Sequence, residues 1–72
     1  MPEYRIFAYD KDQDRSDLII SIPKTIGMDA TLPCLIARNI SELVKSERLK
    51  SQDGQPYDWV EVWLNDEHIY VC

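Results

Sequence analysis

Only one stretch of this chain has the periodicity of a helix, and it lies between two pairs of strand-like segments. Its apolar residues recur at steps of three and four, as expected for a helix that buries one face. They are Leu32, Ile36, Ile40, Leu43 and Val44. The opposite side is predicted to carry Arg38, Ser41, Glu42 and Lys45. Thr31 or Asp29 should cap the start, Pro33 fits the first turn, and the helix should fade near Leu49.

Four other segments alternate or are rich in β-branched and aromatic residues, which is typical of strands. They are residues 4–9, 18–22, 57–64 and 67–72. Asn65-Asp66 joins the last two and predicts a type I′ hairpin, since both residues tolerate positive φ. The order ββαββ predicts an α+β fold, with one amphipathic helix packed on one face of a mainly antiparallel four-stranded sheet. At this length, residues 1–72 should form a single domain.

The hairpin turn also predicts the register, because side chains alternate between the two faces of a sheet. The expected pairs are Leu64–Glu67, Trp63–His68, Val62–Ile69, Glu61–Tyr70, Val60–Val71 and Trp59–Cys72. One face is then aliphatic and should pack on the helix: Ile6, Ala8, Leu18, Ile20, Ile22, Val60, Val62, Ile69 and Val71. The other face holds Arg5, Phe7, Tyr9, Ile19, Tyr57, Trp59, Glu61, Trp63, His68, Tyr70 and Cys72.

An aromatic face that a single helix cannot cover usually marks an interaction surface, and Trp and Tyr are enriched in interface hot spots. The alternative is a purely structural face, covered by residues 24–31 or by the N-terminal segment. If the face is open, two copies can stack it together into a homodimer, since a twofold interface needs one self-complementary patch. Unpaired strands at the sheet edges offer a second route to a dimer.

The charge distribution favours a protein partner with a basic surface. The net charge is −5, and residues 51–72 carry five acids with no Lys or Arg. Acids near the aromatic face would steer a basic partner toward it. Nucleic acid is not expected, because phosphate binding needs Lys and Arg around the rings. The predicted partner-binding residues are Phe7, Tyr9, Asp58, Trp59, Glu61, Trp63, Asp66, His68 and Tyr70.

The chain shows no signs of secretion or membrane insertion. Its first seven residues, MPEYRIF, do not resemble a signal peptide, and no apolar run approaches the roughly 20 residues that span a bilayer. Two cysteines, Cys34 and Cys72, match no zinc spacing and allow one disulfide at most. We therefore expect a cytoplasmic protein that binds no membrane, metal or cofactor.

Three weaker patterns have functional alternatives. Asp10-x-Asp12-x-Asp14 resembles the start of a calcium loop, but Arg15 replaces its turn glycine and Ser21 its final carboxylate, so a solvated hairpin loop is favoured. Cys34 lies in a first helical turn, where a thiol pKa can fall, although a half-buried packing role is the simpler interpretation.

The third pattern is the single histidine, His68, with Glu61, which would suit a small-molecule or catalytic site on the aromatic face. No recognisable catalytic pair or phosphate loop accompanies them. The favoured function is therefore a small acidic, non-enzymatic protein-interaction module, acting as an inhibitor, adaptor or regulator and self-associating through the aromatic face. The alternatives are a small-molecule-binding or catalytic domain, and a calcium-stabilised module built on residues 10–17.

Overall fold

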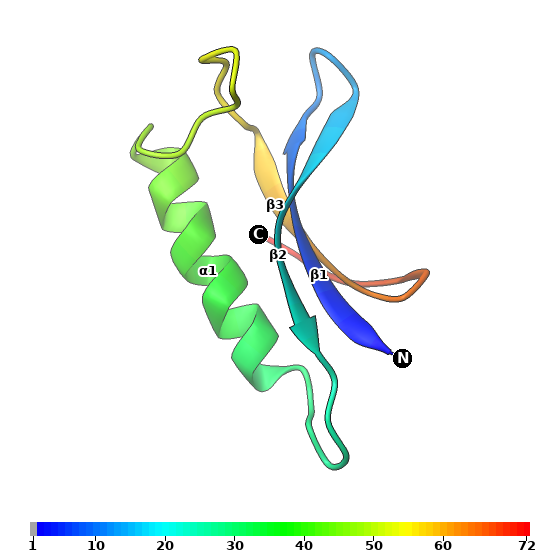
Figure 1. Ribbon diagram of the computed structural model, residues 1–72. Helices are drawn as coiled ribbons and strands as arrows, with labels where there is room; N and C mark the ends of the chain where they lie inside the picture. Colours follow the sequence, from blue (N-terminus) through cyan, green and yellow to red (C-terminus); the bar gives the residue numbers. More distant parts are fainter. Residues whose placement is uncertain (1) are drawn as a thin grey trace.

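The chain folds into one open antiparallel sheet with a single helix on one face (Figure 1). This computed structural model describes residues 2–72. The elements are β1 (Glu3–Asp10), β2 (Arg15–Pro23), α1 (Thr31–Lys45), β3 (Trp59–Leu64) and β4 (Glu67–Val71). The strands lie in the order β2-β1-β3-β4, so the two central strands come from opposite ends of the chain. The predicted α+β fold with the order ββαββ is confirmed.

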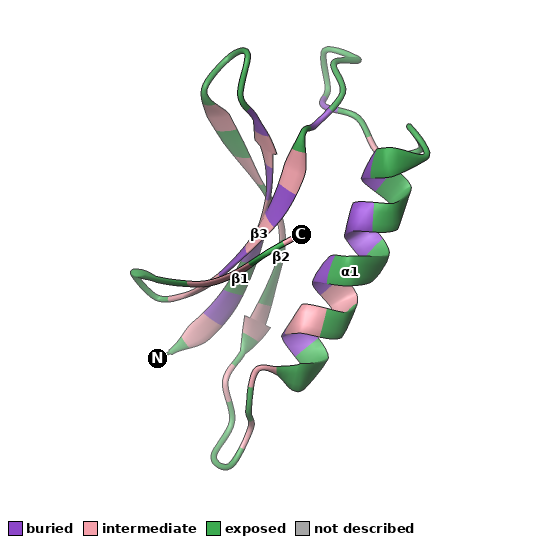
Figure 2. Ribbon diagram, turned by 180° about the vertical axis from the view of Figure 1, so that it is seen from behind, coloured by how far each residue is buried: buried purple, intermediate pink, exposed green. Residues whose placement is uncertain are grey.

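The core lies between α1 and the two central strands. Ile6 of β1 and Val60 and Val62 of β3 are fully buried beneath the helix, together with Ala8 and Ala37. Figure 2 shows the buried residues on the facing sides of α1 and the sheet. We call the helix-covered side of the sheet the inner face and the opposite side the outer face.

Local backbone contacts set both ends of α1. At the start, the Oδ1 atom of Asp29 accepts the N–H of Thr31 at 3.0 Å, and this bond holds the pKa of Asp29 below its usual value. At the other end, Glu47 adopts a positive φ of 60°. The N–H of Glu47 then bonds the carbonyl of Val44, and the N–H of Arg48 bonds that of Leu43, which is a Schellman closure. The helix therefore ends at Lys45, short of the predicted Leu49.

The buried side of α1 is rotated from the predicted stripe. Its buried residues are Pro33, Ala37, Ile40, Ser41 and Val44. Leu32 and Leu43, both predicted to be in the core, are 53% and 41% exposed, whereas Ser41, predicted to face solvent, is buried. Small side chains at positions 37 and 41 allow α1 to lie close to β3, against which it mainly packs.

Two irregularities in the sheet change which residues share a face. Ile19 has no opposite residue in β1, and Ile69 has none in β3. Such bulges insert one extra residue and reverse the alternation beyond it. The observed partners Phe7–Leu18, Val62–Tyr70 and Glu61–Val71 follow from these two bulges.

The bulges overturn part of the predicted register. The pairs nearest the turn, Leu64–Glu67 and Trp63–His68, are confirmed, but the more distant pairs are shifted by one residue. Leu18 and Val71 therefore lie on the outer face, whereas Ile19, Tyr70 and Cys72 lie on the inner side. The β3–β4 turn also differs from type I′, because only Asn65 of its two residues has positive φ.

Tyr57 was likewise predicted on the aromatic face and is instead in the core. It precedes β3, is 8% exposed, and donates its hydroxyl to Asp17 of β2 at 2.7 Å. Burial, followed by this hydrogen bond, raises the pKa of Tyr57 to about 12.

Candidate functional site

The outer face is organised around the middle of β3. Trp59, Glu61 and Trp63 alternate along this strand and lie opposite Tyr9, Phe7 and Arg5 of β1. His68 and Val71 of β4 extend these rows on one side, and Ser16, Leu18 and Ser21 of β2 extend them on the other. The outer face therefore has aromatic side chains at its centre and one carboxylate among them.

Glu61 accepts a hydrogen bond from each flanking tryptophan. The indole N–H of Trp59 lies 2.7 Å from Oε2, and that of Trp63 lies 3.0 Å from Oε1. The three side chains can meet because residues two apart on a strand share a face. An ionised carboxylate offers about four acceptor positions, so both oxygens can accept further donors. The site is a half-buried anion whose two protein partners are neutral.

Ring stacking holds both tryptophans in place. Tyr9 stacks on Trp59 with centroids 4.7 Å apart, and Trp63 stacks on His68 at 5.0 Å. The Tyr9 hydroxyl donates to Asp14 in the β1–β2 turn, and this bond raises the pKa of Tyr9. Each indole is therefore fixed by a stacked ring and by a bond to Glu61. A surface organised in this way loses little side-chain entropy when it binds.

No second layer covers the outer face within residues 2–72. α1 lies on the inner side (Figure 2). In the 24–30 connector, Met28 and Ala30 pack against that same core. On the outer face, the aromatic side chains of β1 and β3 are half-buried, while Leu18, His68 and Val71 are exposed. A shallow depression of about 330 Å³ is lined by Arg5, Phe7, Ser16, Glu61, Trp63, Asn65 and Asp66. The predicted open aromatic face is therefore present, although smaller than expected.

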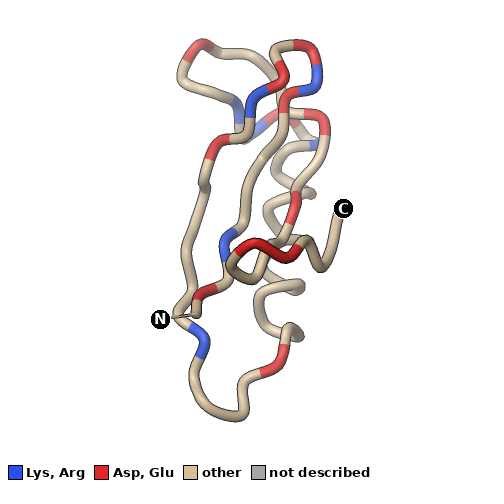
Figure 3. Tube along the Cα trace, turned by 90° about the vertical axis from the view of Figure 1, so that its right-hand side faces the viewer, with Lys and Arg blue, Asp and Glu red and all other residues tan. Residues whose placement is uncertain are grey.

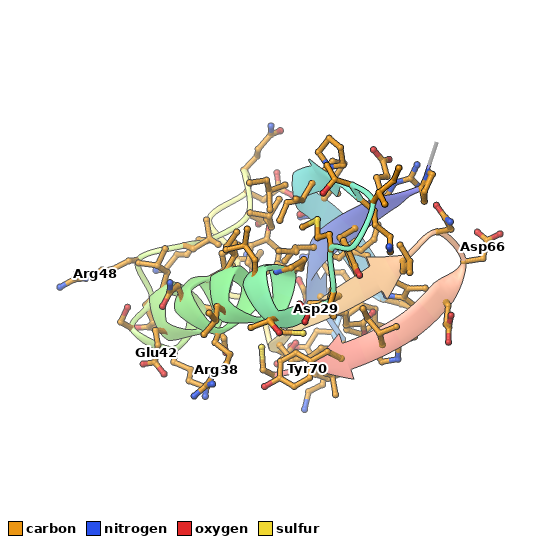
Figure 4. All side chains as sticks on the ribbon, turned by 90° about the horizontal axis from the view of Figure 1, so that it is seen from below. Asp29, Arg38, Glu42, Arg48, Asp66 and Tyr70 are labelled. Carbon is orange, nitrogen blue, oxygen red and sulfur yellow. The ribbon has the colours of Figure 1, made fainter. Side chains whose placement is uncertain are left out.

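Most of the predicted site residues are brought together. Phe7, Tyr9, Trp59, Glu61, Trp63 and His68 share the outer face, and Asp66 lies at its rim in the β3–β4 turn. Tyr70 does not belong to this set, since the bulge at Ile69 directs it toward α1, where it lines hollows beside Arg38 (Figure 4). Asp58 accepts the N–H of Lys11 at 2.8 Å and so anchors the β1–β2 turn.

Sequence reasoning missed Leu18 and Val71 as outer-face residues. Both are apolar β-strand residues that strict alternation assigns to the core. Only the bulges at Ile19 and Ile69 reverse that assignment, and neither is marked by the glycine that signals some bulges.

The two residues proposed for catalysis, Glu61 and His68, form no hydrogen bond with each other. His68 stacks on Trp63, and its Nε2 lies 3.1 Å from the carbonyl oxygen of Tyr70. Glu61 is held by the two indoles instead. A general acid or base must be within hydrogen-bond reach of its proton partner, and this pair forms no such relay.

In the acidic loop, residues 10–17, the carboxylates of Asp10, Asp14 and Asp17 accept hydrogen bonds from other groups of the protein. Asp10 is buried and accepts the N–H groups of Asp12 and Gln13, at 3.1 and 3.4 Å, which closes the turn. Asp14 accepts the Tyr9 hydroxyl, and Asp17 accepts the Tyr57 hydroxyl. Across residues 2–72, no three His, Cys, Asp or Glu side chains are grouped so as to hold a metal ion.

Both cysteines are free and half-buried. Burial raises the pKa of the Cys34 thiol, and the proximity of Cys72 raises it further. Cys34 therefore has the half-buried packing position that was favoured.

Comparison with known proteins adds no family to this description. No protein-family model, no curated protein and no solved structure matches this chain. In the part of the chain that is described, α1 is neither long nor apolar enough to cross a bilayer.

Proposed function

We propose that this protein is a non-enzymatic interaction module that binds a protein partner through its outer sheet face. The observation that carries the proposal is the Glu61 carboxylate, held between the indoles of Trp59 and Trp63 at the centre of an open aromatic face. Neutral donors orient this carboxylate without neutralising its charge. A cation from a partner is the natural complement.

An arginine or lysine side chain suits this arrangement in two ways. Its N–H groups can bond the free acceptor positions of Glu61, and charge-assisted bonds of this kind are stronger than neutral ones. Its charge can also lie over the adjacent rings, where a cation–π contact contributes about 0.5–2 kcal/mol, depending on desolvation. A partner with a basic side chain projecting from its surface therefore fits the centre of the face.

The acids around the face support the same partner. Asp66 of the β3–β4 turn lines the same depression as Glu61, and the exposed Glu67 follows it at the start of β4. At the end that holds the β1–β2 turn, acidic and basic residues are intermixed (Figure 3). Exposed charges of one sign steer encounter with an oppositely charged surface more than they add affinity. They would likewise repel nucleic acid.

Self-association through the outer face is less favoured than binding of a basic partner. Stacking two copies would bring Glu61 of each toward an acidic surface, which like charges oppose. We propose a cytoplasmic inhibitor, adaptor or regulator without a cofactor. The two free cysteines support that compartment, since reducing conditions keep thiols unpaired.

A hexa-arginine peptide tests the central contact directly. In ¹⁵N-labelled protein, the two indole N–H signals of Trp59 and Trp63 should shift as the peptide is added. Glu61→Gln removes the charge at constant size and should weaken binding about tenfold, equivalent to about 1.4 kcal/mol.

Glu67→Gln is the matched control, because Glu67 is an exposed acid of the same hairpin that bonds neither indole. It should change affinity far less than Glu61→Gln. Equal losses in the two variants would mean that the peptide senses net charge alone. Shifts confined to the 46–56 segment would move the site away from this face.

A further inference from the structure

We propose that two copies of this chain pair through β2, with the exposed flank of α1 packing across the same twofold axis. This surface is distinct from the outer face and does not depend on its function. It arises because α1 packs mainly on β3 and leaves the inner side of β2 only partly covered.

Apolar side chains of both β2 and α1 are exposed to solvent at this uncovered region. Ile20 pairs with the buried Ile6 and so lies on the inner face, yet it is 39% exposed. Leu32 and Leu43, on one side of α1, are 53% and 41% exposed. Exposed apolar residues that gather between a strand and a helix are characteristic of an association surface.

The free edge of β2 supplies the polar part of the interface. β2 is the outermost strand of the sheet, so one side of its backbone has no partner strand within residues 2–72. Protein edges are usually protected by charges or proline. In β2 such residues stand only at the ends, as Arg15, Asp17 and Pro23, and the run Leu18–Ile22 contains none. The other edge, β4, is shorter and carries Glu67 and His68. Of the two edge strands, β2 is therefore the better suited to pair with another strand.

A second copy of β2 fits this edge by symmetry. Two identical strands pair antiparallel about a twofold axis, and the bulge at Ile19 limits the regular run to Ile20–Ile22. Centring the axis on Ser21 places Ile20 of each copy opposite Ile22 of the other. Each such pair lies on the inner face, beside the exposed flank of α1.

Charge complementarity supports this arrangement. The first residues of β2 include Asp17, which pairs with Arg15 at 3.3 Å in the same chain, and Lys24 follows the end of β2. Antiparallel pairing across Ser21 brings Lys24 of each copy to the Asp17 end of the other. Lys24 of each copy therefore approaches the Arg15–Asp17 pair of the other, whereas parallel pairing would place Lys24 beside Lys24.

Light scattering at tens to hundreds of micromolar should give about twice the 8.4 kDa chain mass. Ile20→Lys places a charge on the pairing edge and should yield monomers. Val71→Lys is the matched control, since Val71 is 51% exposed on the other edge strand, and it should leave the dimer intact. A monomeric wild type, or a dimer lost in Trp63→Ala and kept in Ile20→Lys, would overturn the proposal.

If Ile20→Lys fails to fold, a disulfide cross-link tests the β2–β2 pairing instead. Opposed residues of an antiparallel pair have Cα atoms about 4.5–5.5 Å apart, within disulfide range. In a background lacking Cys34 and Cys72, Ser21→Cys should oxidise to a covalent dimer. Ser16→Cys, on the same face but distant from the axis, should not. Equal cross-linking of both variants would refute the proposed register.

Discussion

The carboxylates of Asp17 and Glu61 lie on opposite faces of the sheet and have different partners. On the inner side, Asp17 accepts the Tyr57 hydroxyl at 2.7 Å and pairs with Arg15 at 3.3 Å. These contacts join β2 to the segment before β3. On the outer side, Glu61 accepts two neutral indole donors and has no basic partner among the described residues. Asp17 therefore serves the fold, and Glu61 is the candidate recognition group.

The Tyr57 contact predicts a specific loss of stability in alkali. The unfolded tyrosine ionises near pH 10, whereas the folded state keeps its proton until the pKa of about 12. The contribution is therefore complete below pH 10 and is lost as the pH rises to 12. At pH 11 the wild type should have lost about 1.4 kcal/mol through this group, a loss that Tyr57→Phe cannot show.

Urea unfolding at pH 8 and pH 11 measures this difference. Other tyrosines and lysines titrate in both proteins, so the comparison between wild type and Tyr57→Phe isolates the one hydroxyl. An identical decline in the two proteins would show that Tyr57 ionises as freely in the folded state as in the unfolded state.

At the scale of elements, small backbone irregularities decide which surfaces exist. The bulge at Ile19 moves Leu18 to the outer face, and the bulge at Ile69 moves Tyr70 toward α1. The positive φ of Glu47 ends α1 and directs the chain into the 46–56 segment. Each irregularity involves one residue, yet it changes the direction of side chains beside it.

The positive φ at Glu47, just after α1, can be tested by mutation. A residue at the C′ position of a Schellman motif has left-handed backbone geometry, which strains any residue with a Cβ atom. Glu47→Gly should therefore stabilise the protein by about 0.5–1 kcal/mol, measured by urea unfolding. Glu42→Gly is the control, because it removes the same charge from an exposed position within the helix and should cost about 1 kcal/mol. Destabilisation by both changes would contradict the Schellman assignment.

The whole molecule is elongated, with principal extents of 38 × 21 × 17 Å. One helix cannot cover a four-stranded sheet. The fully buried side chains of the protein therefore belong to α1 and to the two central strands, β1 and β3. β2 is left with an open edge and a partly exposed inner side. A domain of 72 residues has a thin stability margin, and burying more surface by association is a common remedy.

The melting temperature of the whole protein tests the acidic loop. Because Asp10, Asp14 and Asp17 already accept protein donors, we expect millimolar Ca²⁺ to move the melting temperature by no more than about one degree. A ligand at 100 times its dissociation constant would stabilise by about 2.7 kcal/mol, which is several degrees for so small a domain. Mg²⁺ at equal concentration controls for ionic strength. A shift of several degrees specific to Ca²⁺ would establish a calcium site.

The number, type and order of the elements could be predicted from the sequence, and so could the residues at the centre of the candidate site. Apolar periodicity is a local property, so the single helix and the strands could be located without tertiary information. The alternation of Trp59, Glu61 and Trp63 within one strand likewise placed them on a common face. Trp63 and His68 were correctly paired because they lie close to the turn that sets the register.

The strand order, the rotation of α1 and the limits of the aromatic face depend on tertiary packing and could not be predicted. Ala37 and Ser41 became core residues because they let the helix approach β3, a gain that depends on residues distant in sequence. Tyr57 was drawn into the core by Asp17, 40 positions earlier. Such choices minimise the free energy of the whole assembly, so no local pattern in the chain specifies them.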